Sequence, residues 1–532
     1  MLVELVLVAV LALLFYYQFV RPLNHFARMG VKQTNTALPI FGDRWGVELR
    51  LEKSYFDLIK RVYFSCDRDD RYVGLYNFTN PILFIRDPQL IKELFIKHFD
   101  SFNHRIPHID PDSDPLWAAN LTQIKGERWK EMRQSLSGSF TSSKMKFIFE
   151  LLNKSCSQFA EHYASANGPT EVDMNDVSAM LTTDSIATSA YGIEVNSFKD
   201  PDNVFFMMSK NILNLTTFRS QIKVLLTTIC PFLLRIFKVG LFDKIVTDHI
   251  SKIIEDTITM REKTGFVRPD MINVLLETRK VAKTNTAEDN TMETGYATAK
   301  ESTALDKQKV KKRPLTNFEI ASQAFVFFFA GQSSNTTSIT FTFYELAVNP
   351  DIQERLRADI KETHKKNGNK ATYESVLGIK YLDMVVSESL RKWSPIVNFD
   401  RVCTKSFTIE PVRPGEKPIH MKPGDCIGAV PSCIQRDPKY FPNPDVFDPE
   451  RFSEENIHKI VPYTFIPFGL GPRNCIGSRY ALLQTKLAIY HILLNCKIVP
   501  TSRTPIPMKT GFNWFLLHPE NGLYLALEPL KE

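Results

Sequence analysis

The ten residues Phe468-Gly-Leu-Gly-Pro-Arg-Asn-Cys475-Ile-Gly477 constrain the fold of this chain more than any other segment. A helical pattern over 478–494 follows them, so Cys475 stands at the amino terminus of a helix. Backbone N–H groups and the helix dipole can hold a thiolate there, and Gly471 and Gly477 let a flat partner approach the backbone. Without such flanks, an isolated cysteine is usually an inert buried thiol. Because no CxxC pair or histidine spacing accompanies Cys475, zinc is poorly supported, whereas a haem iron needs only one protein thiolate.

This segment resembles the haem-binding signature of the cytochrome P450 family, F-x-x-G-x-R-x-C-x-G. Its five fixed residues would match by accident in on the order of one chain in several thousand. The resemblance implies haem b (iron protoporphyrin IX) as the cofactor and Cys475 as the metal ligand, a proximal thiolate whose electron donation favours O–O cleavage. It also implies that Phe468 packs on the sulfur side, that Arg473 reaches a haem propionate, and that Gly477 belongs to the cofactor-binding loop.

Three residues far upstream of Cys475 are further candidates for cofactor binding. Trp129-Lys-Glu-Met-Arg133 places an indole and a guanidinium on adjacent turns of one helix face. Taken alone, this spacing is typical of a half-buried amphipathic helix. The resemblance implies instead that Trp129 and Arg133 form the W-x-x-x-R pair that binds the haem propionates. It implies the same role for Arg401, in Arg401-Val402-Cys403.

A long helix is predicted over 317–348, opened by the capping box Thr316-x-x-Glu319 and closed by Asn349-Pro350. Its middle changes from the apolar run 325–330 to the polar run 331–337. Polar groups inside a buried helix need partners, because each unpaired group costs about 1 to 3 kcal/mol. Hydroxyls that bond back to carbonyls, together with a glycine, could open the helix and admit water.

In the family this helix carries the motif A-G-x-(Glu/Asp)-Thr, whose acid and alcohol organise water for proton delivery during oxygen activation. Ala330 and Gly331 match, but Ser333 stands at the acid position and Ser334 at the threonine position. These four residues are the candidate catalytic residues. Loss of the carboxylate removes a charged proton relay, so we hypothesise that residues 335–337 substitute for it through water.

The family's buried scaffold network is implied by Glu388-Ser-Leu-Arg391 and by Pro449-Glu-Arg451-Phe452. An E-x-x-R pair alone carries little information, since exposed pairs of this kind abound and contribute little. We assign Glu388, Arg391 and Arg451 to the scaffold. The chain departs from many relatives at Gln435, where a histidine is common, and in a proline-poor hinge reduced to Pro39.

The first twenty residues are apolar apart from Glu4 and Gln18, close to the roughly 20 residues that a spanning helix needs. Positive charges follow this run in 21–32, which favours an anchor over a cleaved signal peptide. The same charges favour a catalytic domain on the cytosolic side. We therefore expect a transmembrane anchor over 1–20, a hinge over 21–45, and localisation in the endoplasmic reticulum membrane. The glycosylation tripeptides at Asn77 and Asn120 conflict with a cytosolic location.

The remainder, 46–532, is expected to form one large catalytic domain, mainly α with a smaller β part and the cytochrome P450 fold. A length of 532 residues suggests three or four domains, but residues that serve one haem and span positions 129 to 475 must share one core. The stretch 279–313 is polar and ends in a basic cluster, so it is predicted to be a solvated linker. Helical patterns lie at 88–98, 142–164, 175–191, 241–263, 352–366 and 381–392, in addition to the two above.

Strand signals are short. Residues 72–77 and 82–86 are predicted to pair, and Asn521-Gly522 predicts a hairpin between 512–517 and 523–527. The eight scattered cysteines favour reduced thiols over a disulfide framework. The formal charge of +7 is dispersed, which argues against nucleic-acid binding.

The family motifs occur in the family's order over nearly the whole chain, and the chain resembles the microsomal insect branch that detoxifies plant toxins and insecticides. This implies a lipophilic small-molecule substrate and electrons from an NADPH-cytochrome reductase, with cytochrome b5 as a second donor. A basic patch for an acidic donor is expected from Lys125, Arg128, Lys130, Lys144 and Lys146. The resemblance assigns substrate contacts to 106–124, 205–218, 325–329, 396–399 and 514–517.

Three functions stay open at this point. The first is a reductase-dependent monooxygenase. The second is a haem-thiolate isomerase or dehydratase that rearranges peroxides without a reductase, which the missing acid at Ser333 favours. The third is a non-catalytic haem- or ligand-binding membrane protein. Turnover with reductase and NADPH separates the first from the others, and peroxide rearrangement separates the second from the third.

Overall fold

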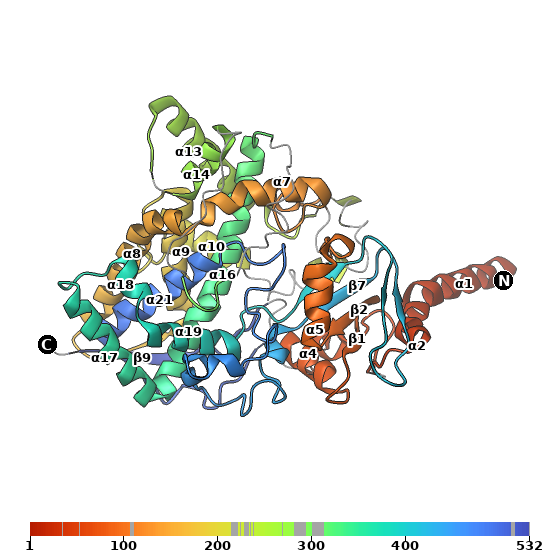
Figure 1. The fold of residues 1–532 in the computed structure, drawn as a ribbon. Coiled ribbons are helices and arrows are strands. Elements are labelled where there is room, and N and C mark those ends of the chain that lie inside the picture. Colours follow the sequence, from red (N-terminus) through yellow and green to blue (C-terminus); the bar gives the residue numbers. More distant parts are fainter. Residues whose placement is uncertain are drawn as a thin grey trace.

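The computed structural model describes the chain apart from residues 35, 50, 53, 107–110, 214–221, 224, 228–233, 235, 238, 269, 281–293, 300–312, 512–515 and 531–532. A helical rod leaves a body in which most helices gather on the side away from the rod, while strands lie both near the rod and among those helices (Figure 1). The fold is therefore mainly α with a smaller β part, as predicted.

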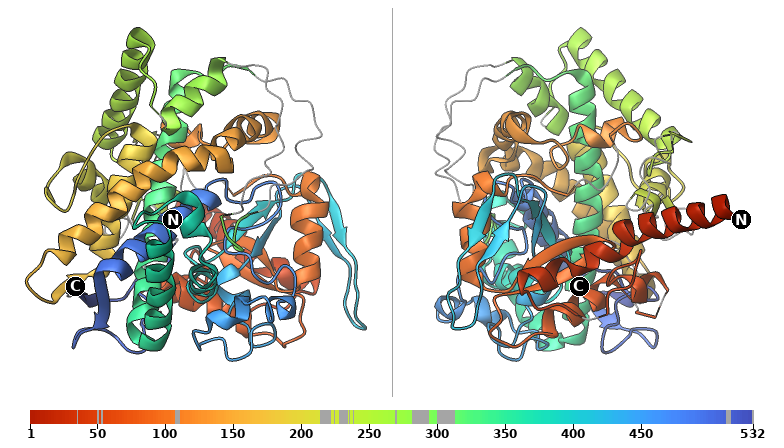
Figure 2. Two further views of the ribbon diagram at one scale, coloured as in Figure 1. Left: turned by 60° about the vertical axis from the view of Figure 1, so that its left-hand side comes forward. Right: turned by 90° about the vertical axis from the view of Figure 1, so that its right-hand side faces the viewer.

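The rod extends over Leu2–Met29, with mean hydropathy 2.2 and no residue of its apolar window buried. It joins α1 (Leu2–Phe15), a π-helical turn η1 (Tyr16–Val20), a 3-10 turn η2 (Arg21–Asn24) and α2 (His25–Met29). In the two views of Figure 2 it projects away from the body. The rod is long and apolar enough to cross a bilayer, and its exposed part precedes the buried Phe26.

Much of the segment expected to be a hinge packs against the body. Phe26 is buried, and its ring lies so close to Gly74 that a Cβ at Gly74 would collide with it. Asp43 accepts hydrogen bonds from Thr34 at 2.5 Å and from the Tyr76 N–H at 2.8 Å. Of the two glycosylation tripeptides, the one at Asn120 is inaccessible, because that side chain is fully buried.

The helices follow the predicted patterns closely. Helices α8 (Ser142–Ala164) and α16 (Asn317–Val348) have the predicted bounds, and Thr316 and Glu319 form the predicted capping box. The patterns at 88–98 and 175–191 each change from α to π geometry, and 241–263 starts later, since Asp243 is extended. The other helices of the body are α3 (Trp45–Glu48), α4 (Tyr55–Phe64), α5 (Pro88–Lys92), η3 (Glu93–Lys97), η4 (Phe99–Ser101), α6 (Pro115–Ala118), α7 (Gly126–Ser137), η5 (Gly138–Phe140), α9 (Met174–Ile186), η6 (Ala187–Tyr191), α10 (Val204–Leu213), α13 (Lys244–Thr264), α14 (Met271–Lys280), α17 (Pro350–Lys366), α18 (Tyr373–Leu377), α19 (Lys380–Lys392), α20 (Pro431–Ile434), η7 (Pro449–Phe452), η8 (Ile457–Lys459) and α21 (Ser478–Asn495).

The described residues form three small sheets. The largest has the order β1-β2-β7-β4, in which β2 and β7 are parallel and the other pairs antiparallel. It confirms the predicted pairing of 72–77 with the following strand. The sheets contain β1 (Tyr72–Asn77), β2 (Asn80–Ile85), β7 (Cys426–Ala429) and β4 (Phe399–Val402); β3 (Thr170–Asp173), β9 (Tyr524–Pro529) and β8 (Cys496–Pro500); and β5 (Phe407–Ile409) and β6 (Ile419–Met421).

The predicted carboxy-terminal hairpin is wrong. Strand β9 pairs with β3 on one edge and β8 on the other, so both of its edges are taken. Leu516 bridges to Ile396, and the Leu517 N–H donates to Pro395. Residues 512–515 of the predicted strand lie outside the described residues. Tertiary pairing with distant strands thus overrides the local turn signal.

The linker prediction also fails for 294–299, the central residues of 279–313 that the structure describes. Thr294 is fully buried and Ala297 nearly so. The rest of 281–312 lies outside the described residues.

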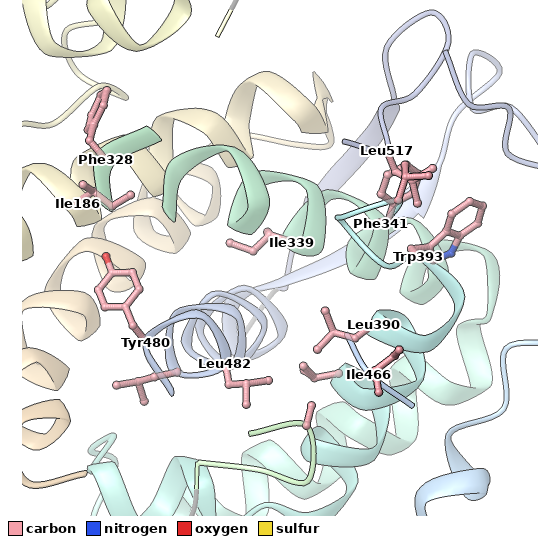
Figure 3. Close-up of a cluster of buried hydrophobic side chains, with 14 of the residues drawn as sticks. Ile186, Phe328, Ile339, Phe341, Leu390, Trp393, Ile466, Tyr480, Leu482 and Leu517 are labelled. Carbon is pink, nitrogen blue, oxygen red and sulfur yellow. The ribbon is translucent and has the colours of Figure 1, made fainter. Parts of the chain in front are cut away.

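Helix α16 passes through the centre of the body between α9 and α21. Figure 3 shows Ile339 of α16 near Leu482 of α21, and Phe341 of α16 beside Trp393. The Phe341 and Trp393 rings stack at 4.6 Å with an interplanar angle of 9°. Because buried apolar side chains fix these three helices to one another, their ends are held in fixed positions around the cavity described below.

The implied scaffold network is present at the end of α19. Both carboxylate oxygens of Glu388 accept from Arg391, at 2.7 and 2.9 Å, and neither side chain is exposed. Arg451 approaches Glu388 at 3.4 Å. Gln435 donates to the Leu390 and Arg391 carbonyls and accepts from the Ile466 N–H at 2.8 Å. Gln435 therefore ties α19 to the segment that leads to Cys475.

We expect Glu388→Gln to lower the free energy of unfolding by about 3 to 5 kcal/mol, because it leaves the buried Arg391 cation without a carboxylate. Denaturation of the full-length protein, followed by circular dichroism, measures this loss. The matched control is Glu450→Gln, whose partner Arg355 is half exposed, and it should cost no more than about 1 kcal/mol. Equal losses in the two variants would contradict the scaffold role.

Candidate active site

One cavity of about 940 Å³ brings together all the candidate catalytic, cofactor-binding and metal-ligating residues. It lies between the middle of α16 on one side and the segment before α21 on the other. Its lining includes Trp129, Arg133, Ala330, Gly331, Ser333, Ser334, Arg401, Phe468, Arg473, Cys475 and Gly477. Residues up to 348 positions apart in the sequence therefore share one site.

The loop before α21 presents the Cys475 thiol to this cavity. The Cys475 N–H donates to the Phe468 carbonyl at 2.9 Å, and the Asn474 N–H donates to the Gly471 carbonyl at 3.0 Å. Gly471 has φ +71°, and a Cβ on it would collide with the Phe95 carbonyl. The thiol is accessible only because the cavity opens in front of it, so the loop offers one sulfur to whatever fills the cavity.

The pKa of Cys475 depends on opposing effects. Burial raises the pKa of the thiol above its usual value, while the Gly477 N–H and the Arg133 and Arg105 guanidiniums act to lower it. A thiolate bound to a metal ion would gain from the same donors. At Gly477 itself, a Cβ would meet only the Phe140 ring, at 3.8 Å, so no part of the described protein requires a glycine there. A flat ligand bound in the cavity would require a glycine at this position.

The opposite wall is the middle of α16. The Ser333 hydroxyl donates to the Phe329 carbonyl at 2.6 Å, and the Ser334 hydroxyl donates to the Ala330 carbonyl at 2.7 Å. A Cβ at Gly331 would lie 3.1 Å from Ile186, so this glycine brings α9 close to α16. The expected opening of the helix is not found, because α16 is continuous from Asn317 to Val348. The hydroxyls bond back without breaking it.

Polar side chains continue along α16 beyond Ser334. The Asn335 amide donates to Gln484 at 2.5 Å, Thr336 shares a hydrogen bond of 2.8 Å with Thr182, and Thr337 donates to the Ser333 carbonyl at 3.1 Å. Among the described lining residues, the carboxylates are Asp176 and Asp400, and neither belongs to α16. The structure thus offers hydroxyls and amides beside Ser333.

Four buried guanidiniums surround the rim next to Cys475. Arg133 donates to the Asn474 carbonyl and side chain at 2.9 and 2.6 Å, and Arg473 donates to the Asn103 carbonyl at 2.6 Å. Arg401 donates to the Asp400 carbonyl at 2.6 Å. The fourth, Arg105, donates to the Arg473 carbonyl at 3.1 Å. Trp129 lies beside them, with its ring 4.2 Å from the Arg473 guanidinium carbon.

The described protein offsets the charges of this cluster only in part, because the buried Asp400 carboxylate acts to raise the pKa of Arg105, Arg401 and Arg473. Burial and repulsion from Arg105 lower the pKa of Arg401 to about 9, and burial with repulsion from Arg105 and Arg401 lowers the pKa of Arg473 to about 8. The Nε atoms of Arg105 and Arg401 are buried without a hydrogen-bond partner. Because buried charges are costly unless they are paired, and these guanidiniums outnumber the Asp400 carboxylate, the rim fits a ligand that brings anionic groups, as the two propionates of haem would.

Arg105 was not among the candidates from sequence. It is an isolated cation in Asn103-His-Arg105, ahead of an apolar segment, and its spacing matches no helix or strand pattern. Only the fold brings it within reach of Arg473 and the cavity. Asn474, which binds Arg133, was equally missed, although it lies inside the ten-residue motif.

Apolar side chains form the remainder of the cavity wall. Trp117 packs against Phe242 and Phe329 with ring centroids 5.1 Å away from its own. From the segments expected to touch substrate, the cavity receives Ile106, Trp117, Leu121, Thr122, Gln123, Lys210, Val326, Phe327, Phe329, Ile396, Asn398, Phe399, Leu516 and Leu517. Phe325 and Phe328 belong to the buried core instead. Residues 107–110, 214–218, 514 and 515 of those segments lie outside the described residues.

The expected basic patch is largely neutralised by acids of the same chain. Arg128 pairs with Glu131 and Glu319, and Lys130 pairs with Glu127. Lys144 pairs with Glu277, and Lys146 pairs with Glu374. Four of the five expected cations are thus partnered, which weakens the case for a patch of free positive charge.

Comparison with known proteins places these residues in a family context. Residues 37–526 match the sequence model described as Cytochrome P450. The chain is 36% identical to "Probable cytochrome P450 9f2" of Drosophila melanogaster, covering 98% of both chains. It is 36% identical to "Cytochrome P450 9e2" of Blattella germanica, covering 95% of this chain and 94% of that protein. With "Cytochrome P450 6k1" of Blattella germanica the identity is 34%, covering 98% and 96%.

We expect Gly471→Ala to abolish the thiolate-type carbon monoxide difference spectrum of the reduced protein. The new Cβ would push the loop away from the Phe95 carbonyl and displace Cys475. The matched control is Gly265→Ala, at φ +68° with nothing within 4 Å, which carries the same backbone strain of roughly 1 to 2 kcal/mol without the collision. A normal spectrum in both variants would show that the loop tolerates displacement.

Proposed function

Because this chain belongs to the cytochrome P450 family, a family of haem-thiolate monooxygenases, we propose that its substrates are lipophilic small molecules such as xenobiotics, plant toxins and insecticides. We further propose that NADPH supplies the electrons through a flavoprotein reductase, with cytochrome b5 as a second donor. The observation that carries the proposal is the shared cavity, with one thiol, a cationic rim and an apolar wall.

Each group of lining residues has a part in this function. Haem bound in the cavity supplies the iron that activates dioxygen. Cys475 would hold the iron from the α21 side, and Arg105, Arg133, Arg401 and Arg473 would fix the propionates. The Phe468 side chain would cover the sulfur and limit its contact with water.

On the opposite wall, Ser333 and Ser334 would take part in proton delivery. Their hydroxyls already donate to carbonyls of their own helix, so their oxygen lone pairs are the groups that a water molecule in the cavity can use. Thr337 and Asn335 extend this polar surface, since Thr337 donates to the Ser333 carbonyl and Asn335 donates to Gln484 of α21. Proton delivery through water and hydroxyls, without a carboxylate, is the proposed arrangement in this chain.

The substrate class follows from the wall around Trp117. Indole and phenyl rings from α6, α16 and the segment before α13 offer large apolar surfaces with few charges. Such a wall favours aromatic or polycyclic lipophiles over small polar molecules. The relatives named above come from insects, which agrees with the proposed action on plant toxins and insecticides.

We propose that the exposed apolar segment 1–20 anchors the protein in the endoplasmic reticulum membrane, with the catalytic domain on the cytosolic side. Its apolar window is wholly exposed, and Arg21 and Arg28 follow the apolar run. The tendency of positive loops to stay in the cytosol gives the orientation. A lipophilic substrate dissolved in the same bilayer would then be close to the cavity.

A second candidate function is a reductase-independent isomerase or dehydratase acting on peroxides. The serine at position 333 favours it, because peroxide rearrangement needs no proton relay for dioxygen activation. The two functions differ in their need for external electrons.

The proposed function is tested by reconstituting the full chain with NADPH-cytochrome reductase in phospholipid vesicles. We expect a thiolate-type carbon monoxide spectrum and NADPH-dependent oxidation within a panel of polycyclic lipophiles. Cys475→Ser, as the control, should lose both. An imidazole-type spectrum would exclude Cys475 as the ligand, and rearrangement of a fatty-acid hydroperoxide without NADPH-dependent products would favour the isomerase.

The proposed proton path is tested by Ser333→Glu, which restores the family's acid. We expect hydrogen peroxide released per NADPH consumed to fall by roughly twofold or more, because a positioned acid speeds proton transfer. Ser338→Glu, five residues further along the same helix and equally buried, is the control and should not improve coupling. Unchanged coupling in Ser333→Glu would show that the missing acid does not limit the reaction.

A further inference from the structure

Residues 294–299, Thr-Gly-Tyr-Ala-Thr-Ala, dock against the outer side of the Cys475 loop although they were expected to be solvated. They lie between α14 and α16 in the sequence, far from Cys475 along the chain. Thr294 has no exposed surface and Ala297 is 6% exposed. Their contacts are made with the elements that carry the proposed iron ligand.

Three hydrogen bonds hold the backbone of this segment. Lys486 of α21 donates to the Thr294 carbonyl at 2.7 Å, and the Tyr296 N–H donates to Asp383 of α19 at 3.0 Å. The Ala299 N–H donates to the Ser478 hydroxyl at 3.2 Å. Ser478 is the first residue of α21, three positions after Cys475. The segment is therefore tied directly to the start of the helix that follows the thiol.

A buried ion pair depends on the same segment. The Lys486 ammonium lies 2.8 Å from an Asp383 carboxylate oxygen, and the Lys486 side chain is 1% exposed. Burying an ammonium is costly unless its donors are satisfied, and the Thr294 carbonyl satisfies one of them. Without residues 294–299, this cation between α19 and α21 would lose a partner.

The Tyr296 side chain adds aromatic contacts to the hydrogen bonds of the segment's backbone. Its ring stacks on Phe465 at 5.7 Å with an interplanar angle of 19°, and lies 5.5 Å from Phe452. Phe465 and Phe452 also contact each other at 4.8 Å. Phe465 lies three residues before Phe468, where the Cys475 loop begins. The segment thus touches both ends of the loop, Phe465 on one side and Ser478 on the other.

The backbone at Gly295 is adapted to this docking. Gly295 has φ +153°, and a Cβ there would collide with the Asp383 carboxylate and lie 2.9 Å from the Lys486 nitrogen. Only glycine allows the chain to approach the ion pair this closely. On the inner side of the loop, Figure 3 shows Ile466 near Leu390 and Leu482, so apolar contacts hold that side and residues 294–299 hold the other.

We propose that residues 294–299 are a positioning segment for Cys475, which clamps the ends of its loop to α19 and α21 and shields the outer side from water. This inference rests on the proposed role of Cys475 as the iron ligand. Groups around a metal ligand orient it and control its contact with solvent, and their loss typically costs 10- to 100-fold in metal affinity. The segment acts through the loop and does not touch the cavity.

The test compares Tyr296→Ala, Tyr296→Phe and Gly295→Ala in the full-length haem protein. We expect haem transfer to apomyoglobin to be about tenfold faster in Tyr296→Ala and Gly295→Ala, within the range above. Their reduced carbon monoxide complexes should also convert faster from the thiolate-type to the neutral-thiol spectrum in mild denaturant. Tyr296→Phe keeps the ring and should behave as the unmodified protein. Phe266→Ala removes an aromatic side chain of similar exposure elsewhere and should have no effect.

Two results would overturn the proposal. One is haem transfer and spectral conversion at the unmodified rates in both Tyr296→Ala and Gly295→Ala. The other is a loss confined to reductase-supported turnover, with peroxide-supported turnover and haem retention intact, which would assign the segment to the docking surface of the electron donor. Failure of the proposed function itself is distinguishable, because the unmodified protein would then lack the thiolate-type spectrum.

Discussion

The architecture of this protein depends on holding one thiol at a fixed point between a loop and a helix. Cys475 is fixed by its own N–H, which bonds to the Phe468 carbonyl, and by α21, which begins three residues later. Helix α21 is in turn packed against α16, which forms the facing wall. The distance between the thiol and the hydroxyls of α16 is therefore set by the packing of two long helices. A loop alone could not hold it.

The charges of buried arginines near this thiol are compensated in two different ways. In the scaffold, Arg391 is matched by Glu388 and by backbone carbonyls, so its charge is compensated within the chain. At the rim, Arg105, Arg401 and Arg473 repel one another around the Asp400 carboxylate, and the Nε atoms of Arg105 and Arg401 have no hydrogen-bond partner. The first arrangement is compensated within the chain, whereas the second leaves an excess of positive charge that an anionic ligand would compensate. This difference distinguishes the scaffold arginine from the arginines proposed to bind the cofactor.

Several features of the fold could be predicted because their causes are local. Helix α16 has the predicted bounds, since its capping box and closing proline are sequence neighbours of its ends. The hairpin predicted at Asn521-Gly522 was wrong, because β9 pairs with β3 on one edge and with β8 on the other. The segment 294–299 was predicted to be solvated from its polar composition, yet its backbone groups and one aromatic ring bind distant residues. Local patterns carry no information about such pairings.

By itself, the sequence determined the family, the haem ligand to be tested and most residues of the proposed site, because ten contiguous residues around Cys475 and a few short spacings carry them. The sequence also indicated that residues from Trp129 to Cys475 must belong to one core. Only the tertiary structure decided that Arg105 joins the cationic rim, that Gln435 ties α19 to the thiol loop, and that residues 294–299 cover that loop. The reason is physical: these roles arise from contacts between segments with no common period or motif, and such contacts exist only after the helices have packed.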